Sequence, residues 1–158
     1  MIVGKEENRK QKGKGEGMPT LSRWFIKSGI IYFVASMILL MLLQLHQKGI
    51  FSAAWIPFLK PVFYHTLMVG WITQIIFGVS IWMFPRYSRE KPRGSEPIGW
   101  LAFGCLNLGL VLRIVGEPML GAQGGSFWSF TLVVASILFW LAGIFYIAII
   151  WQRVKGKN

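Results

Sequence analysis

The stretch SGIIYFVASMILLMLLQLH, residues 28–46, decides the fold. It is almost entirely apolar and close to the roughly 20 residues that an α-helix needs to cross the hydrocarbon core of a bilayer. Three further runs of this kind follow at 62–84, 97–116 and 127–151, and none has an acidic residue in its middle. The sequence therefore predicts an all-α integral membrane protein, a four-helix bundle with four spans.

Composition excludes several other classes of protein. Of the 158 residues, 54% are hydrophobic and only 15% are charged, whereas soluble domains carry about 25% charged residues. Because the apolar residues come in long unbroken runs, a soluble enzyme domain is excluded. The single cysteine, Cys105, excludes an internal disulfide framework and a Cys-rich zinc site. We interpret Cys105 as a small packing residue.

The chain divides into a tail and a membrane domain. Residues 1–20 are polar, rich in glycine and lysine, and too poor in apolar side chains to fold, so we expect a flexible basic tail. They lack the features of a signal peptide, and we expect the first span to be retained in a domain over 21–158. Prolines and glycines mark the connections between spans; the third is expected around Pro118, Gly121, Gly124 and Gly125.

The basic residues cluster at one side of the predicted bundle. The formal net charge is +11, and 14 of the 17 Lys and Arg residues lie before the first span, between the second and third spans, or after the fourth. By the positive-inside rule, this distribution places both termini and the middle loop in the cytoplasm. The positive charge is thus explained by topology and by contact with anionic lipid, so no nucleic-acid partner is expected. Six of the eight tryptophans lie near predicted span ends, as an interfacial belt requires.

Polar groups inside lipid are candidate functional groups because they are costly to bury there. His65 lies about one turn into the second span, and a neutral imidazole can ligate haem iron. The alternative is a structural histidine that hydrogen-bonds a neighbouring helix. The spacing of Thr66, Gly70, Gln74 and Gly78 at every fourth residue predicts a small or polar seam, for close helix approach or for a flat cofactor.

Arg113 lies at a depth similar to that of His65, near the outer end of the third span. Glu117 follows four residues later, which predicts an intrahelical ion pair that reaches the outer interface. The alternative is that Arg113 faces a packed seam and would sit near the propionates of a haem held by His65. His46 closes the first span on the same side, as an interfacial residue or as a second axial ligand.

The stretch PVFYHTLMVGWITQIIFGVSIWMFPR, residues 61–86, resembles the second transmembrane helix of subunit I of the haem-copper oxidase superfamily, its cytochrome c oxidase and nitric oxide reductase branch. The resemblance implies that His65 ligates a low-spin haem b. Only the first four helices of that subunit have counterparts here. Its copper ligands and second haem ligand lie on later helices, so no catalytic haem-copper centre is expected.

Three functions follow as hypotheses. The first is a truncated oxidase-subunit-I-like protein in a respiratory electron-transport complex of the cell inner membrane, with a haem b at His65. The second is a non-redox accessory subunit that packs against a larger membrane complex or a second copy of itself. The third and weakest is a small transporter that uses Gln74 and Asn107 near the middle of the membrane. With no aspartate in the chain, no residues form a hydrolase centre.

Overall fold

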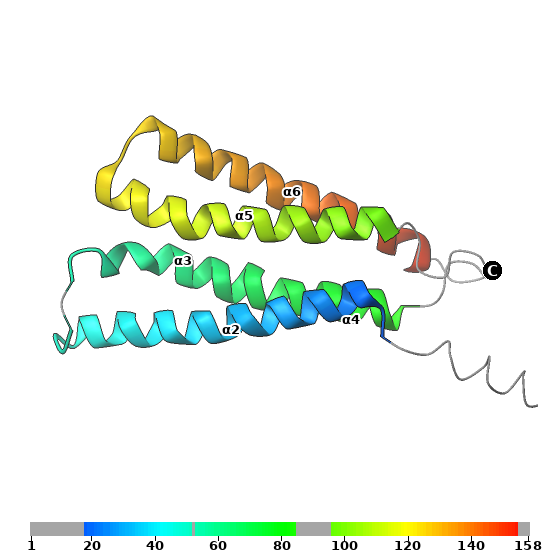
Figure 1. Cartoon of the computed structure of the whole chain (residues 1–158), viewed down its shortest axis with the longest axis horizontal. Helices are drawn as coiled ribbons and strands as arrows, with labels where there is room; N and C mark the ends of the chain where they lie inside the picture. The colour runs from blue at the N-terminus through cyan, green and yellow to red at the C-terminus, as the bar shows by residue number, and fades with distance from the viewer. Residues whose placement is uncertain (1–17, 52, 85–95, 155–158) are drawn as a thin grey trace, which may run out of the picture.

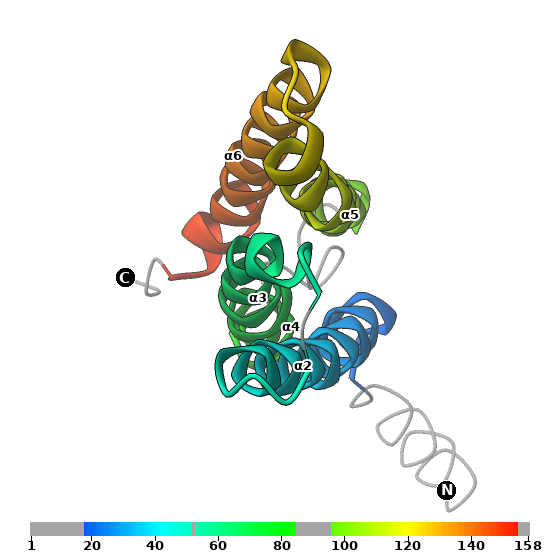
Figure 2. The ribbon, with the colours of Figure 1, turned by 90° about the vertical axis from the view of Figure 1, so that its left-hand side faces the viewer.

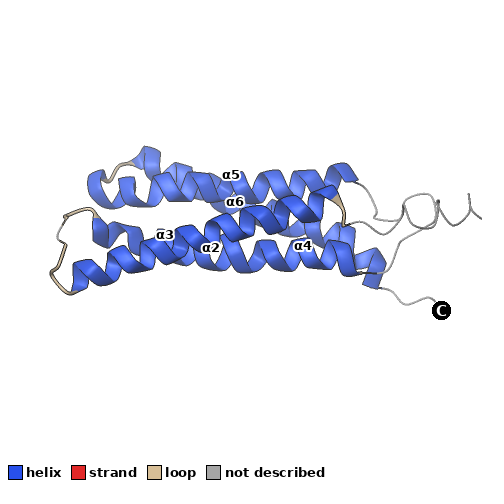
Figure 3. Ribbon diagram, turned by 60° about the horizontal axis from the view of Figure 1, so that its bottom comes forward, coloured by secondary structure: helices blue, strands red, loops and turns tan. Residues whose placement is uncertain are grey.

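The computed structural model describes residues 18–51, 53–84 and 96–154, and all secondary structure within these ranges is helical (Figure 3). Most of the predicted tail lies outside these ranges. The same is true of the basic residues of the predicted middle loop, Arg86, Arg89, Lys91 and Arg93, and of Lys155 and Lys157. The all-α class predicted from the sequence is confirmed for the described part of the chain.

Four helical stretches are long and apolar enough to cross a membrane, as the sequence predicts. The first is α2 (Thr20–Gln47), and the last two are α5 (Glu96–Gln123) and α6 (Ser126–Val154). The second stretch is continuous from Ile56 to Met83. It is divided into the 3-10 turn η1 (Ile56–Leu59), α3 (Lys60–His65), the π-helix η2 (Thr66–Thr73) and α4 (Gln74–Met83). The chain is a multi-pass membrane protein.

The helices are arranged as two hairpins. The second helical stretch packs along α2, and α6 packs along the length of α5 (Figure 1). An end-on view shows α6 lying beside α5 and away from α2 (Figure 2). The contacts between the hairpins are fewer, and they run mainly from η1, α3 and η2 to α5, with smaller contributions from α2 to α5 and from α4 to α6. The few residues that join the hairpins therefore determine how the bundle holds together.

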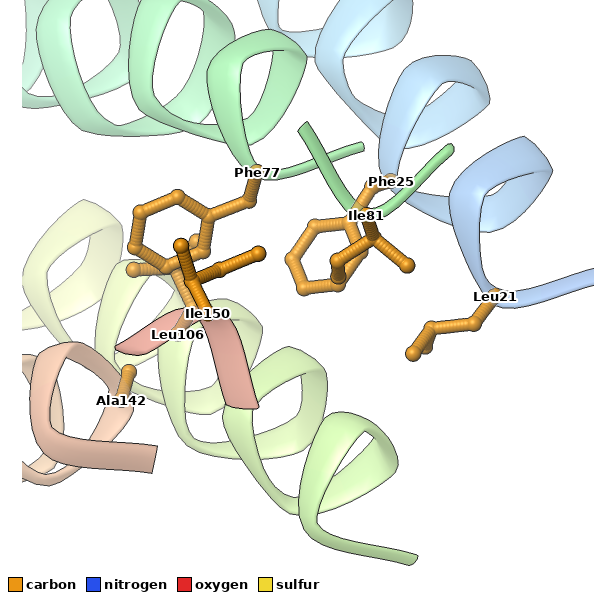
Figure 4. Close-up of a cluster of buried hydrophobic side chains, with 7 residues drawn as sticks. All are labelled: Leu21, Phe25, Phe77, Ile81, Leu106, Ala142 and Ile150. Carbon is orange, nitrogen blue, oxygen red and sulfur yellow. The ribbon is translucent and has the colours of Figure 1, made fainter. Parts of the chain in front are cut away.

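An apolar cluster joins all four helices near the ends of α2 and α6 that lie close to the chain termini (Figure 4). Phe77 of α4 stacks on Tyr146 of α6 with ring centroids 3.7 Å apart, and Phe25 of α2 meets Phe77 edge-on at 5.9 Å. The buried members of the cluster are Leu21, Phe25, Phe77, Ile81, Leu106, Ala142 and Ile150.

A buried arginine ties the hairpins at the same end of the bundle. Arg153 of α6 donates hydrogen bonds from Nη1 to the carbonyl oxygen of Ile81, at 3.1 Å, and from Nη2 to that of Phe84. These two carbonyls lie at the end of α4, where a helix has no intrahelical donors left. Arg153 was counted in the sequence only for its charge, and the structure gives it a second role in joining α6 to α4.

The small-residue seam on the second stretch is a helix-packing surface. A β-carbon on Gly70 would lie 2.8 Å from Cβ and Cγ of Tyr32, and one on Gly78 would lie 3.0 Å from Cβ of Phe25. Side chains of α2 therefore fill the seam at both glycines. Of the two uses predicted for it, the structure shows close helix approach.

The third connection is shorter than predicted. The sequence places it around Pro118 to Gly125, but α5 continues to Gln123 with Pro118 inside it. Only Gly124 and Gly125 form the turn, with φ of +67° and +103°. Gly121 is helical because its missing side chain makes room for Phe58, whose Cδ1 would lie 2.5 Å from a β-carbon there. In this helix Gly121 allows close packing of Phe58, and Pro118 does not end the helix.

The π-helix η2 changes the direction in which side chains leave the second stretch. His65 and Gln74 are nine residues apart, so a regular α-helix would place them about 180° apart. A helix with bonds to the fifth residue turns only ~80° per residue, which brings both side chains toward the same side. Both contact α5 in the structure.

Candidate functional site

Glu117 is the centre of a polar cluster at the end of the bundle that holds the turn at Gly124. Its Oε1 lies 2.8 Å from Nδ1 of His65 and 2.8 Å from Nη1 of Arg113. The Glu117 side chain is 5% exposed. The predicted ion pair within α5 is present, and the same carboxylate also links α5 to α3. The structure thus brings His65 and Arg113 together, as their similar depth predicted.

Arg113 also reaches the neighbouring helix. Its Nη2 donates a hydrogen bond to Oγ of Ser136 in α6 at 2.7 Å, and its Cζ lies 5.6 Å from the ring centroid of Phe139. The side chain is 18% exposed, so Arg113 faces the packed seam between α5 and α6. Ser136 was not singled out from the sequence. The only signal was a hydroxyl within the long apolar run of the fourth span.

The contacts of His65 determine its tautomer. Nδ1 lies 3.0 Å from the carbonyl oxygen of Pro61 as well as 2.8 Å from Glu117 Oε1. Both partners are acceptors, so Nδ1 carries the proton, and in the neutral ring Nε2 has a free lone pair. Nε2 has no hydrogen-bond partner among the residues that the structure describes. The side chain is 29% exposed, which leaves Nε2 as the available atom.

These contacts test the haem hypothesis. A carboxylate or carbonyl on Nδ1 is the usual support of a metal-ligating histidine, which favours ligation through Nε2. Three other observations oppose a haem enclosed by one chain. The seam beside His65 is filled by Tyr32, the guanidinium of Arg113 is already bound to Glu117 and Ser136, and within the described residues no contact joins His46 to His65. A haem enclosed within a single chain therefore does not fit.

His46 lies at the outer end of α2, with Nδ1 buried and without a hydrogen-bond partner in the described part of the chain. No group of three or more His, Cys, Asp and Glu residues that could hold a metal ion occurs in the described ranges.

A second polar network lies nearer the middle of the membrane. Gln74 is fully buried; its Oε1 accepts a hydrogen bond from the Ser28 hydroxyl, and its Nε2 donates to Oδ1 of Asn107 at 3.1 Å. Asn107 donates in turn to the carbonyl of Phe103 at 2.9 Å. The network joins α2, α4 and α5, and its side chains hydrogen-bond to groups of the same chain. Such networks hold transmembrane helices together, which argues against Gln74 and Asn107 as a transport site.

Comparison of the chain with protein-family models, with curated proteins and with solved structures finds no match. The resemblance of residues 61–86 to an oxidase helix therefore stays a prediction from the residues alone, and function has to be argued from the geometry of the two polar networks.

Proposed function

We propose that the chain is a non-redox accessory subunit that packs against a larger protein complex in the membrane. One observation carries this proposal: in the described part of the chain, the intramembrane side chains that could act on a substrate bind one another. Of their atoms without a partner, Nε of Arg113 and Oε2 of Glu117 are buried, and Nε2 of His65 belongs to a partly exposed side chain. Glu117 holds His65 and Arg113, and Gln74 holds Ser28 and Asn107. A chain built in this way holds its own helices together and offers its surface to partners.

The exposed surface supports the same proposal. No more than 33% of the most apolar window of any span is buried within the chain. Every span presents large apolar side chains outward, including Ile31 on α2, Met83 on α4, Val111 on α5 and Trp140 on α6. Lipid can cover such faces, and so can the helices of a partner.

Topology and location are part of the proposal. The excess of basic residues in the tail, the middle loop and the C-terminal segment favours a bundle with both termini in the cytoplasm. The membrane is then the cell inner membrane, and a respiratory complex is the candidate partner.

The test is purification of the tagged full-length protein in a mild detergent, with a dithionite-reduced minus air-oxidised visible spectrum. The proposal expects migration with a larger complex, no haem band assigned to this chain, and the same migration for His65→Ala. A haem band that disappears in His65→Ala, or a chain that migrates alone, would contradict it.

The second candidate is an electron-transfer subunit with a haem b on Nε2 of His65. It is favoured by the free lone pair and by the support that Nδ1 receives from Glu117. When bound, a haem supplies one-electron redox chemistry. Because one chain does not enclose the group, the second ligand would come from His46, a second copy or the partner. The same spectrum tests this candidate, with His46→Ala beside His65→Ala; loss of the bands in both would identify the pair.

A further inference from the structure

The side chain of His65 distinguishes one face of the bundle from the others. In the middle of α2, over residues 30–41, the exposed face is formed by apolar side chains, among them Ile31, Val34, Ile38 and Met41. The face formed by α3 and η2 presents Tyr64, Met68 and Ile72 in the same way, but it also contains the imidazole of His65. Hereafter we call the surface formed by Tyr64, His65, Met68 and Ile72 the His65 face.

The free acceptor of His65 is unlike the other polar atoms in the spans. Its Nδ1 is held by two acceptors of this chain, so the ring is fixed and Nε2 cannot turn inward to find a donor. A polar atom without a hydrogen-bond partner is costly to keep in hydrocarbon. Lipid chains carry no donor, so lipid alone is a poor cover for this face.

Two atoms beside His65 also lack a hydrogen-bond partner, but they lie inside the chain. Oε2 of Glu117 and Nε of Arg113 are buried and have no hydrogen-bond partner in the described part of the chain. The Glu117 side chain is itself 95% buried, so the polar cluster is incomplete within a single chain. Because these two atoms are buried, a partner on the exposed side of the cluster reaches His65 and not Glu117.

We infer that the His65 face is the docking surface for a transmembrane helix of the partner, and that this helix donates an O–H or N–H hydrogen bond to Nε2 of His65. The inference rests on the proposed function and names the surface and the chemistry of its partner. Met68 and Ile72 supply the apolar contact around the hydrogen bond, and the hydrogen bond fixes the depth at which the partner's donor lies.

The experiment uses the full-length protein in its own membrane, with a photo-crosslinking amino acid at Met68. The control carries the crosslinker at Val34 of α2; the two positions are 55% and 52% exposed. We expect a discrete protein adduct from Met68 and none from Val34, and peptide mapping should place the crosslink on a helix of the partner with a hydroxyl or N–H side chain nearby.

Variants of His65 test the hydrogen bond itself. His65→Phe keeps a ring but removes the acceptor, and His65→Gln keeps both a donor for Glu117 and an acceptor for the partner. Interhelical hydrogen bonds in model membrane peptides contribute about 1–2 kcal/mol, equivalent to a loss of roughly 5- to 30-fold in affinity. We expect the yield of the Met68 adduct to fall by this factor in His65→Phe and to be retained in His65→Gln. Changing the partner's mapped donor to alanine should reproduce the loss without altering this chain.

Each other outcome has a defined meaning. An adduct that is unchanged in His65→Phe, an adduct to a second copy of this chain, or adducts to lipid only would overturn the inference. So would a haem band lost in His65→Ala, because iron would then occupy Nε2. If the chain still migrates with its complex while Met68 gives no adduct, the docking surface is wrong and the proposed function stands. If the chain migrates alone, the proposed function is contradicted, and the inference that rests on it is contradicted as well.

Discussion

Replacing Glu117 by leucine removes the carboxylate that joins α3 to α5, and its effect follows from the contacts that remain. His65 keeps the Pro61 carbonyl as a partner for Nδ1. Arg113 keeps the Ser136 hydroxyl and the ring of Phe139 but becomes a largely buried charge without a counter-ion. Breaking a buried ion pair from one side destabilises proteins by about 3–5 kcal/mol. Because Arg113 is 18% exposed, we expect Glu117→Leu to lower the free energy of unfolding by about 3 kcal/mol, at the lower end of that range.

The double variant Arg113→Leu/Glu117→Leu should be more stable than Glu117→Leu. With both charges gone, leucine side chains pack in the same space, and replacement of a whole buried pair is often nearly neutral. A domain of this size loses about 2–4 °C of Tm per kcal/mol. Glu117→Leu should therefore lower Tm by roughly 6–12 °C, and the double variant by about 4 °C or less.

The single cysteine, Cys105, provides a probe for measuring the thermal unfolding of these variants. It is half-buried and packs against the apolar cluster, so a thiol-reactive fluorescent dye reports unfolding of the detergent-solubilised protein. Ser136→Ala serves as a control that removes one neutral hydrogen-bond partner, with an expected loss of about 1 kcal/mol. The single variant Arg113→Leu completes the comparison. The reasoning is refuted if the stability losses of Arg113→Leu and Glu117→Leu add up in the double variant, since the pair would then be uncoupled.

The remaining predictions use the same thermal assay. Gly70→Leu places a side chain against Tyr32 and should lower the free energy of unfolding by about 1–3 kcal/mol. Gly104 has open space beside it, so Gly104→Leu should change the free energy of unfolding by no more than ~0.5 kcal/mol. Equal losses in the two variants would contradict the close packing of the seam. Gln74→Leu leaves Oδ1 of Asn107 without its donor, and a loss of about 1–2 kcal/mol is expected; an unchanged Tm would show that the network is dispensable. Deletion of Met68 lets η2 return to α-helical turns, which separates His65 from Glu117. In this deletion variant, a further Glu117→Gln change should lower Tm little more. A full additional loss would show that the π-helix does not set this contact.

The spans were predictable because length and apolarity decide membrane insertion before any tertiary contact forms. Their ends were not. In α5 the helix continues through Pro118 and Gly121, and Gly121 is a point of close packing with Phe58. The Arg113–Glu117 pair was predictable from spacing within one helix, which requires no knowledge of the fold.

The contacts between helices could be predicted only in part. Similar depth indicated that His65 and Arg113 lie close together, but depth does not identify the shared carboxylate of Glu117 or the hydroxyl of Ser136. The π-helix was missed because the periodicity argument assumes a constant number of residues per turn. With a constant α-helical repeat, His65 and Gln74 would lie on opposite sides of the second span, whereas both contact α5 in the structure.

The arrangement as two hairpins has a consequence for biogenesis. Contacts within each hairpin involve neighbouring spans, so the first pair can form in the bilayer while the second pair is still being synthesised. During that interval Gln74 lacks Asn107 and His65 lacks Glu117, because both partners belong to the later hairpin. The half-made protein therefore exposes an amide and an imidazole to lipid until α5 arrives. A membrane quality-control protease that recognises such polar groups would distinguish the unfinished chain from the assembled one.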